Sequence, residues 1–122
     1  MTISVRPLTP TDRTQWQPLW KGYLDFYKTS VPPEQYDLTW SRFHDPAEPM
    51  FVLGAFEGET MLGIVHYIFH RSCWTAGPYV YLQDLFTSSD ARGKGVGRAL
   101  IEAVYAAAKA EGAARVHWLT HE

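Results

Sequence analysis

A glycine-rich stretch in the second half of the chain most constrains how this sequence can fold. Residues 79–87 form an apolar, β-rich run, residues 88–91 a short polar loop, and residues 92–98 read Arg-Gly-Lys-Gly-Val-Gly-Arg before an alanine-rich run. This order predicts a strand, a loop and a glycine turn that opens a helix. Such a turn leaves several backbone N–H groups without intrahelical partners, and the helix dipole adds positive potential there. With three basic side chains nearby, the stretch predicts a site for a phosphate or pyrophosphate group.

The spacing of the glycines separates the known types of phosphate-binding loop. A Walker loop has Gly-Lys followed by Ser or Thr, whereas Lys94 is followed by Gly95. A dinucleotide fingerprint needs a third glycine at a position where this chain has Arg98 or Leu100. Both patterns therefore fail. A glycine turn that only caps a helix, with solvated basic side chains, stays as the plainer alternative.

The pattern that does match is Arg-x-x-Gly-x-Gly, at Arg92, Gly95 and Gly97. It resembles motif A of the GNAT N-acetyltransferases, and the similarity extends over residues 79–110, with looser support on both sides. The resemblance implies an α/β (α+β) GNAT fold, with a mixed, mostly antiparallel sheet flanked by helices, and acetyl-CoA as the cofactor. The implied cofactor-binding residues are Leu85, Phe86, Thr87, Arg92, Gly93, Lys94, Gly95, Val96, Gly97 and Arg98.

The composition indicates one ordinary domain over residues 1–122. A chain of this length can enclose a single core, and an aromatic content of 15% suggests a dense core or an aromatic-lined groove. The net charge of −2 gives no reason to expect binding to nucleic acid or to an anionic membrane surface. No apolar run approaches the ~20 residues that span a bilayer, and no signal peptide is expected at the start. The single cysteine, Cys73, excludes an internal disulfide and favours a reducing, cytoplasmic location.

Hydrophobic periodicity predicts the element order β-α-α-β-β-β-α-β. The first helix carries an apolar stripe from Trp16 to Tyr27, with Pro18 in its first turn or at a kink. A glycine hairpin is expected between the second and third strands. The predicted strands are 2–6, 50–56, 61–70, 79–87 and 115–120, and the two later helices are 34–44 and the segment from the glycine loop to Gly112.

Two histidines on the third predicted strand raise the question of a metal site. His66 and His70 are four residues apart, so they would share one face of the strand. A metal ion would need a third ligand, and no spacing in the sequence supplies one. We therefore expect no metal, and both histidines on the sheet surface.

Asp84 is the main candidate for a catalytic group. Acetyl transfer requires a neutral amine and hydrogen-bond donors for the charge that develops on the carbonyl oxygen. In the family, the central strand separates from its neighbour near its end, and its free N–H groups bind pantetheine and the acetyl carbonyl, here at Leu85, Phe86 and Thr87. Asp84, with Gln83 beside it, lies just before that point and could accept a proton from an ammonium group. A structural carboxylate bonded to nearby backbone is the alternative for Asp84.

The implied acceptor is a primary amine of a small molecule or of a lysine-containing peptide. Residues 81–86 resemble the corresponding strand of diamine and spermidine/spermine acetyltransferases, within a broader group that includes histone-type enzymes. Those polyamine enzymes have Glu where this chain has Gln83, which makes a polyamine acceptor less favoured. Tyr27, Glu34 and Asp84 are the candidate contacts to the amine, with core packing for the tyrosine and a solvated surface for Glu34 as the plainer interpretations.

The end of the chain departs from the family pattern. The fold normally continues after the last predicted strand with a helix and two strands, and the first of those strands carries a Tyr often assigned as the general acid. Tyr81, His121 or water would have to replace it. Because an uncovered sheet edge invites pairing with another chain, we expect a homodimer or a longer native sequence, with Trp118 and Leu119 at this edge. A non-catalytic acetyl-CoA-binding regulatory module is the competing hypothesis.

Overall fold

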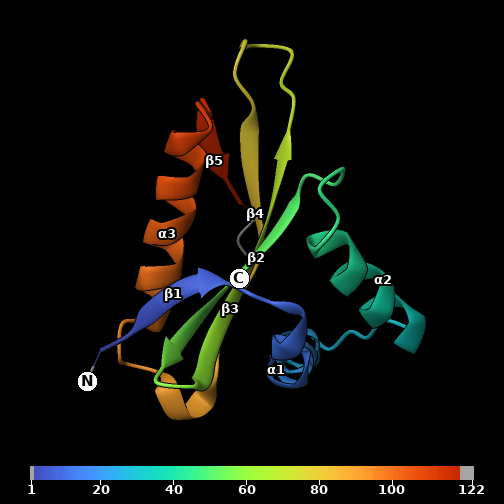
Figure 1. Cartoon of the computed structure of the whole chain (residues 1–122), viewed down its shortest axis with the longest axis vertical. Helices are drawn as coiled ribbons and strands as arrows, with labels where there is room; N and C mark the ends of the chain where they lie inside the picture. Colours follow the sequence, from blue (N-terminus) through green and yellow to red (C-terminus); the bar gives the residue numbers. More distant parts are fainter. Residues whose placement is uncertain (1, 119–122) are drawn as a thin grey trace.

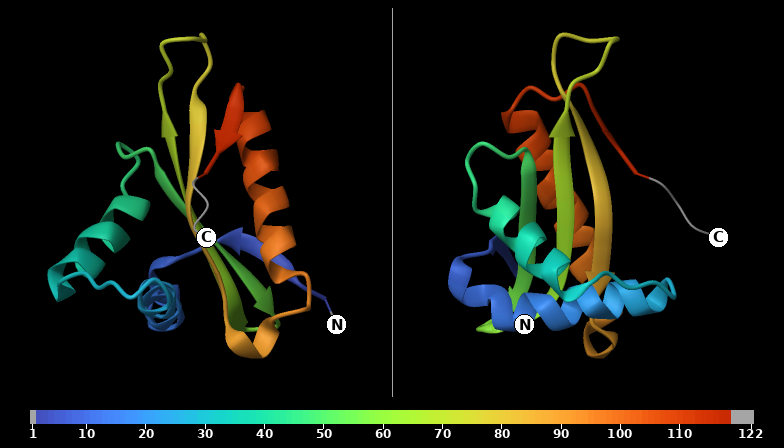
Figure 2. Two further views of the ribbon diagram at one scale, coloured as in Figure 1. Left: turned by 180° about the vertical axis from the view of Figure 1, so that it is seen from behind. Right: turned by 90° about the vertical axis from the view of Figure 1, so that its right-hand side faces the viewer.

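The computed structural model describes residues 2–118 of the chain. Over these residues, one sheet with the strand order β1-β2-β3-β4-β5 carries α3 on one face and α1 and α2 on the other (Figure 1). The view from behind and the side view in Figure 2 show the same three layers. The bounds are β1 Ser4–Pro7, α1 Arg13–Phe26, α2 Pro33–Phe43, β2 Met50–Glu57, β3 Thr60–His70, β4 Tyr79–Thr87, α3 Val96–Ala110 and β5 Arg115–His117, with short 3-10 turns at Pro10–Asp12 and Ser89–Ala91.

The pairing of the strands confirms the predicted element order and the mixed, mostly antiparallel sheet. The three pairs from β1 to β4 are antiparallel, and β5 joins β4 in parallel. The predicted hairpin closes with Glu57 opposite Thr60, and Gly58 in its turn has a φ of +61°. The last strand is shorter than predicted, because Trp118 already lies outside it. The predictions for Leu119 and His121 lie outside the described residues.

The core forms two clusters, one on each face of the sheet. The buried residues of α3 are four positions apart, as on one face of an amphipathic helix, and they pack against alternate residues of β3 such as Val65. The other face of β3 presents Ile64 to an aromatic cluster from α1 and α2 that includes Trp16, Trp20 and Trp40. Fully burying a side chain such as Ile64 contributes roughly 1.5–3 kcal/mol. The two clusters hold α1 and α3 against opposite faces of β4.

Gly63 brings β3, β4 and α3 together where β4 ends. A Cβ added at this glycine would lie 2.9 Å from the carbonyl oxygen of Phe86 and 2.8 Å from a methyl group of Val96. Real Cβ atoms do not tolerate such distances, so glycine at this position allows a close approach of the backbone. The start of α3 therefore lies directly beside the end of β4.

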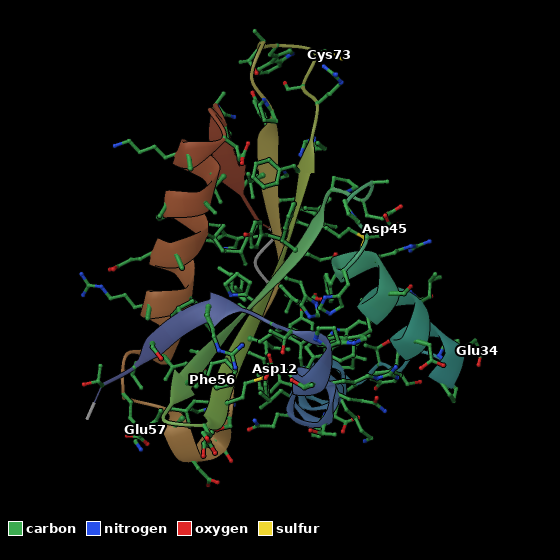
Figure 3. All side chains as sticks on the ribbon, viewed as in Figure 1. Asp12, Glu34, Asp45, Phe56, Glu57 and Cys73 are labelled. Carbon is green, nitrogen blue, oxygen red and sulfur yellow. The ribbon has the colours of Figure 1, made fainter. Side chains whose placement is uncertain are left out.

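The connection between β3 and β4 projects from the sheet, and Cys73 lies exposed within it (Figure 3). In the described part of the chain, no helix is both long and apolar enough to cross a membrane.

Candidate active site

The glycine loop has a backbone that is open to a ligand. Gly93 and Gly95 have φ angles of +83° and +78°, in the left-handed region that favours glycine. A Cβ added at either position would meet nothing within 4 Å, so the space above the loop is free. The first helical bond of α3 runs from the Ala99 N–H to the Gly95 carbonyl at 3.0 Å, which leaves the N–H groups of residues 96–98 without an acceptor inside the helix. Open backbone and unpartnered N–H groups fit the pyrophosphate of acetyl-CoA.

The side chains of the predicted cofactor loop differ in what they offer. Arg92 lines a pocket beside β4, and Lys94 is exposed. Arg98 pairs with Glu102 one turn along α3, with 2.9 Å between Nε and Oε1, as its i, i+4 spacing predicts. Val96 is 1% exposed in the core, so only its backbone N–H could face a ligand. Arg92 and Lys94 are therefore the cations that suit the phosphates best.

A first pocket, of about 200 Å³, lies between the end of β4 and the second half of α1. It brings together Arg92 and Tyr27 with the three strand residues predicted to bind the pantetheine arm. Gly22 allows this arrangement, because a Cβ there would lie 2.9 Å from the ring of Phe86. The residues that line this pocket are Tyr23, Phe26, Tyr27, Leu85, Phe86, Thr87 and Arg92.

A second pocket, of about 420 Å³, extends under α2 on the same face of the sheet. Its lining includes the predicted catalytic residues Gln83 and Asp84 and a cation from α2, Arg42. The Tyr23 hydroxyl donates to the Gln83 carbonyl at 3.4 Å, so this contact lies between the two pockets. Glu34 lines neither pocket and points away from the sheet at the outer end of α2 (Figure 3).

The backbone of β4 is irregular where the two pockets meet. His66 lies opposite Asp84 and Tyr67 lies opposite Leu82, which leaves Gln83 as the extra residue of a β-bulge. On its other edge, β4 pairs with β5 only over residues 79–81. Within the described residues, the edge of β4 from position 82 onward therefore has no strand partner on that side. This stretch includes Leu85, Phe86 and Thr87, where the family resemblance predicts N–H groups that are free to bind the cofactor.

Asp84 is bonded to a buried side chain. Its Oδ2 lies 2.8 Å from Nδ1 of His66, and Nε2 of His66 accepts a hydrogen bond of 2.9 Å from the Trp16 indole. His66 is 3% exposed, so the prediction of a sheet-surface position for this histidine was wrong. The physical reason is that α1 and α2 cover this face of β3. The apolar residues on either side of His66 in the same alternation, Ile64 and Ile68, are the sequence signal that could have indicated burial.

His70, by contrast, is exposed as predicted, and its Nε2 lies 2.8 Å from Nε2 of His117. Across residues 2–118, no three His, Cys, Asp or Glu side chains come together in a way that could hold a metal ion.

Tyr23, at the aromatic end of the stripe on α1, is a further functional candidate, since this end could line a substrate groove and Tyr23 does line the first pocket. Burial raises the pKa of its hydroxyl, and the nearby charge of Asp84 raises it further. The hydroxyl therefore remains a hydrogen-bond donor over the whole neutral range. Only the fold brings this hydroxyl next to Gln83 and Asp84 on β4.

Comparisons with known proteins agree with this geometry. Residues 16–122 match the model of the acetyltransferase (GNAT) family. A curated relative from Saccharomyces cerevisiae, the D-amino-acid N-acetyltransferase HPA3, is 42% identical over 120 residues, which cover 97% of this chain and 74% of the relative.

Solved structures share the fold at lower identity. A ribosomal-protein-alanine N-acetyltransferase from Brucella melitensis biovar Abortus superimposes with a TM-score of 0.81 at 20% identity, over 96% of this chain and 80% of the other. The enzyme AAC(6')-Iy, in complex with a CoA bisubstrate analogue, gives a TM-score of 0.84 at 18% identity, over 99% and 81%. The chain therefore belongs to the GNAT family of acetyltransferases and is an N-acetyltransferase that uses acetyl-CoA.

Proposed function

We propose that this enzyme acetylates a primary amine held in the pocket of about 420 Å³ beside Asp84. The observation that carries the proposal is the meeting of the two pockets at the bulge of β4. One pocket is lined by the strand residues suited to the cofactor, and the other by a carboxylate suited to the amine.

Each part of the site has one role in the proposed reaction. Acetyl-CoA supplies an acetyl group activated as a thioester. The N–H groups of residues 96–98, with the side chains of Arg92 and Lys94, hold its pyrophosphate above the open backbone of Gly93 and Gly95. The backbone of residues 85–87 holds its pantetheine arm. Asp84 accepts a proton from the ammonium form of the substrate, and the backbone of Gln83, at the bulge, sets where Asp84 stands.

The acceptor that we favour is an amino acid or a similar zwitterion. The second pocket combines one carboxylate, Asp84, with one guanidinium, Arg42, and adds apolar walls from residues such as Phe43 and Ile68. Among the described residues, Arg42 forms no ion pair within the protein, so its charge is available to a substrate carboxylate. The name of the yeast relative, a D-amino-acid N-acetyltransferase, supports this class.

Polyamines, other small amines and lysine side chains are the alternative acceptors. A polyamine carries several positive charges, whereas the described lining of this pocket offers one carboxylate and also contains a cation. The acceptors implied by the sequence likeness to diamine and histone-type enzymes thus have less support than a zwitterionic acceptor. Of the predicted amine contacts, Tyr27 lines the first pocket. Glu34, at the outer end of α2, would reach only an extended acceptor such as a peptide.

The test is thiol release from acetyl-CoA with D- and L-amino acids, spermidine, a lysine peptide and an aminoglycoside. We expect Arg42→Gln to raise KM for the best amino acid at least tenfold, about 1.4 kcal/mol, and to leave KM for the matching amine without a carboxylate unchanged. Lys109→Gln, an exposed change on α3, is the control for lost positive charge. Turnover of spermidine alone would contradict the zwitterion, and turnover of no amine would contradict the wider proposal.

A homodimer and a cytoplasmic location are also proposed. The dimer would pair two sheet edges, since β5 extends over three residues only. Light scattering that gives the mass of one chain would refute it. The free, exposed Cys73 supports a reducing compartment.

A further inference from the structure

We infer that His66 is a positioning residue for Asp84, and that the Trp16 indole helps to fix its tautomer. The inference rests on the proposed role of Asp84 as the proton acceptor. It concerns two side chains that touch neither a predicted cofactor atom nor the glycine loop. Both are nearly or completely buried, at 3% exposed for His66 and 0% for Trp16.

The tautomer follows from the chemistry of the partners. An indole N–H can only donate a hydrogen bond, so the His66 Nε2 that lies 2.9 Å from it must carry a lone pair. In a neutral imidazole the proton then sits on Nδ1, which faces Oδ2 of Asp84 at 2.8 Å. The chain of bonds thus runs in one direction, from the indole through the ring to the carboxylate.

The surrounding rings fix the orientation of His66. The Phe43 ring lies 4.8 Å from the imidazole and the Trp20 ring 5.4 Å from it, measured between centroids. The ring cannot rotate without displacing these neighbours, because interiors are close-packed. One oxygen of Asp84, Oδ2, is therefore tied to a rigid donor. We assign the other oxygen, Oδ1, to the amine.

The same arrangement decides which group takes the proton. The only lone pair of the neutral ring already accepts the bond from Trp16, so His66 has none to offer an ammonium group. Oδ1 of Asp84 receives the proton from the substrate nitrogen and releases it to water in the open pocket. Near this His66–Asp84 pair, the described charged or titratable groups include Tyr23 from α1 and Arg42 from α2.

Four variants test the two hydrogen bonds of His66 separately. His66→Leu removes both hydrogen bonds. His66→Asn keeps an N–H near the position of Nδ1 and loses the acceptor for Trp16. Trp16→Phe removes the indole N–H but keeps an aromatic ring. Trp40→Phe is the matched control, since this ring lies 4.6 Å from Trp16 in the same cluster but lines neither pocket.

Turnover is the first measurement. We expect His66→Leu to lower kcat at least tenfold while the Kd of acetyl-CoA stays within twofold, and His66→Asn to recover most of kcat. Trp16→Phe should give an intermediate kcat, and Trp40→Phe one within twofold of the native enzyme. A folded His66→Leu enzyme with native kcat would overturn the inference, as would an Asn variant no better than the Leu variant.

The second measurement needs no substrate. Long-range ¹H–¹⁵N spectra, with the His66 signals identified by their absence in His66→Asn, should show the Nδ1–H tautomer alone in the native protein. Trp16→Phe frees the Nε2 lone pair while Asp84 still accepts from Nδ1–H, so this variant should change the Nε2 signal and leave the proton on Nδ1. Trp40→Phe should show the native spectrum. A native Nε2–H tautomer would refute the inference even if turnover fell. Because the spectra are independent of catalysis, they still test the hydrogen bonds from Trp16 through His66 to Asp84 if the proposed amine acetylation fails. They also decide whether His66 has the inferred tautomer if the His66→Leu variant does not fold.

Discussion

At the scale of single residues, Asp84 is the group whose change should affect the chemistry most. Asp84→Asn keeps an oxygen that can accept the bond from His66, so folding should be preserved, but the amide cannot take a proton. General base catalysis contributes about 10²–10⁴-fold, and we expect kcat to fall by at least about a hundredfold. The Kd of acetyl-CoA, measured by calorimetry, should change less than twofold. Lost thermal stability with unchanged kcat would instead identify Asp84 as a structural carboxylate.

Tyr23→Phe tests the hydroxyl between the two pockets. The variant removes the bond to the Gln83 carbonyl and leaves the ring that lines the cofactor pocket. A neutral hydrogen bond of this kind contributes about 0.5–1.5 kcal/mol, which corresponds to roughly a 2- to 12-fold change. We expect kcat/KM to fall within that range in steady-state assays. Tyr105→Phe, an exposed change on α3, should leave it unchanged, and an equal loss in both variants would contradict a specific role for Tyr23.

The sequence predicted some of these residues better than others for a physical reason. The glycine loop is a local feature, because backbone conformation and helix start depend on neighbouring residues. Asp84 was proposed as a catalytic group because of its place in the strand. The partners of Asp84 were missed, because the bond from Trp16 to His66 joins residues 50 positions apart and exists only when α1 covers that face of β3.

At the scale of elements, the periodicity of apolar residues predicted the helices and strands nearly to their observed ends. Two features of β4 were not predictable from periodicity. The bulge at Gln83 depends on the register with β3, and the extent of the pairing with β5 depends on how β4 and β5 align. Both are consequences of pairing between distant segments.

The link between β1 and α1 gives a pH-dependent prediction. The Arg6 guanidinium bonds to Asp12 at 2.8 and 3.2 Å, the Thr9 N–H bonds to it at 2.7 Å, and these bonds lower the pKa of Asp12 to about 2. A lowered carboxyl pKa stabilises the fold above the unfolded pKa of about 3.9, and the contribution is lost as pH falls toward 2. Because Arg6 is half exposed, we expect on the order of 1–2 kcal/mol.

Urea denaturation of Asp12→Asn checks this contribution. The variant should lose about 1–2 kcal/mol of unfolding free energy at neutral pH, and the difference from the native protein should shrink between pH 4 and 2. Asp37→Asn is the control, since its pair with Arg13 is largely exposed and exposed pairs contribute little. A constant difference over the acid range would show that Asp12 acts by packing and not by its charge.

At the scale of the whole molecule, the proposed cofactor site joins the two cores. Its strand residues belong to β4, whose two faces are covered by different clusters, with Leu85 against the α3 cluster and Phe86 against the α1 cluster. The loop that follows begins α3, and α1 supplies the other wall of the first pocket. A ligand bound there contacts parts of both cores and should therefore stabilise the protein as a unit.

Thermal and urea unfolding with acetyl-CoA measure how much the bound ligand stabilises the fold. At a hundred times its Kd, a ligand that binds only the folded state adds about 2.7 kcal/mol to the free energy of unfolding. Arg92→Glu should weaken binding at least tenfold, so at the same concentration the gain falls to about 1.4 kcal/mol or less. Arg92 is exposed, so the unfolding free energy without ligand should stay near the native value. Arg71→Glu, the same charge change outside the loop, should keep the full gain, and a full gain in Arg92→Glu would place the phosphates elsewhere.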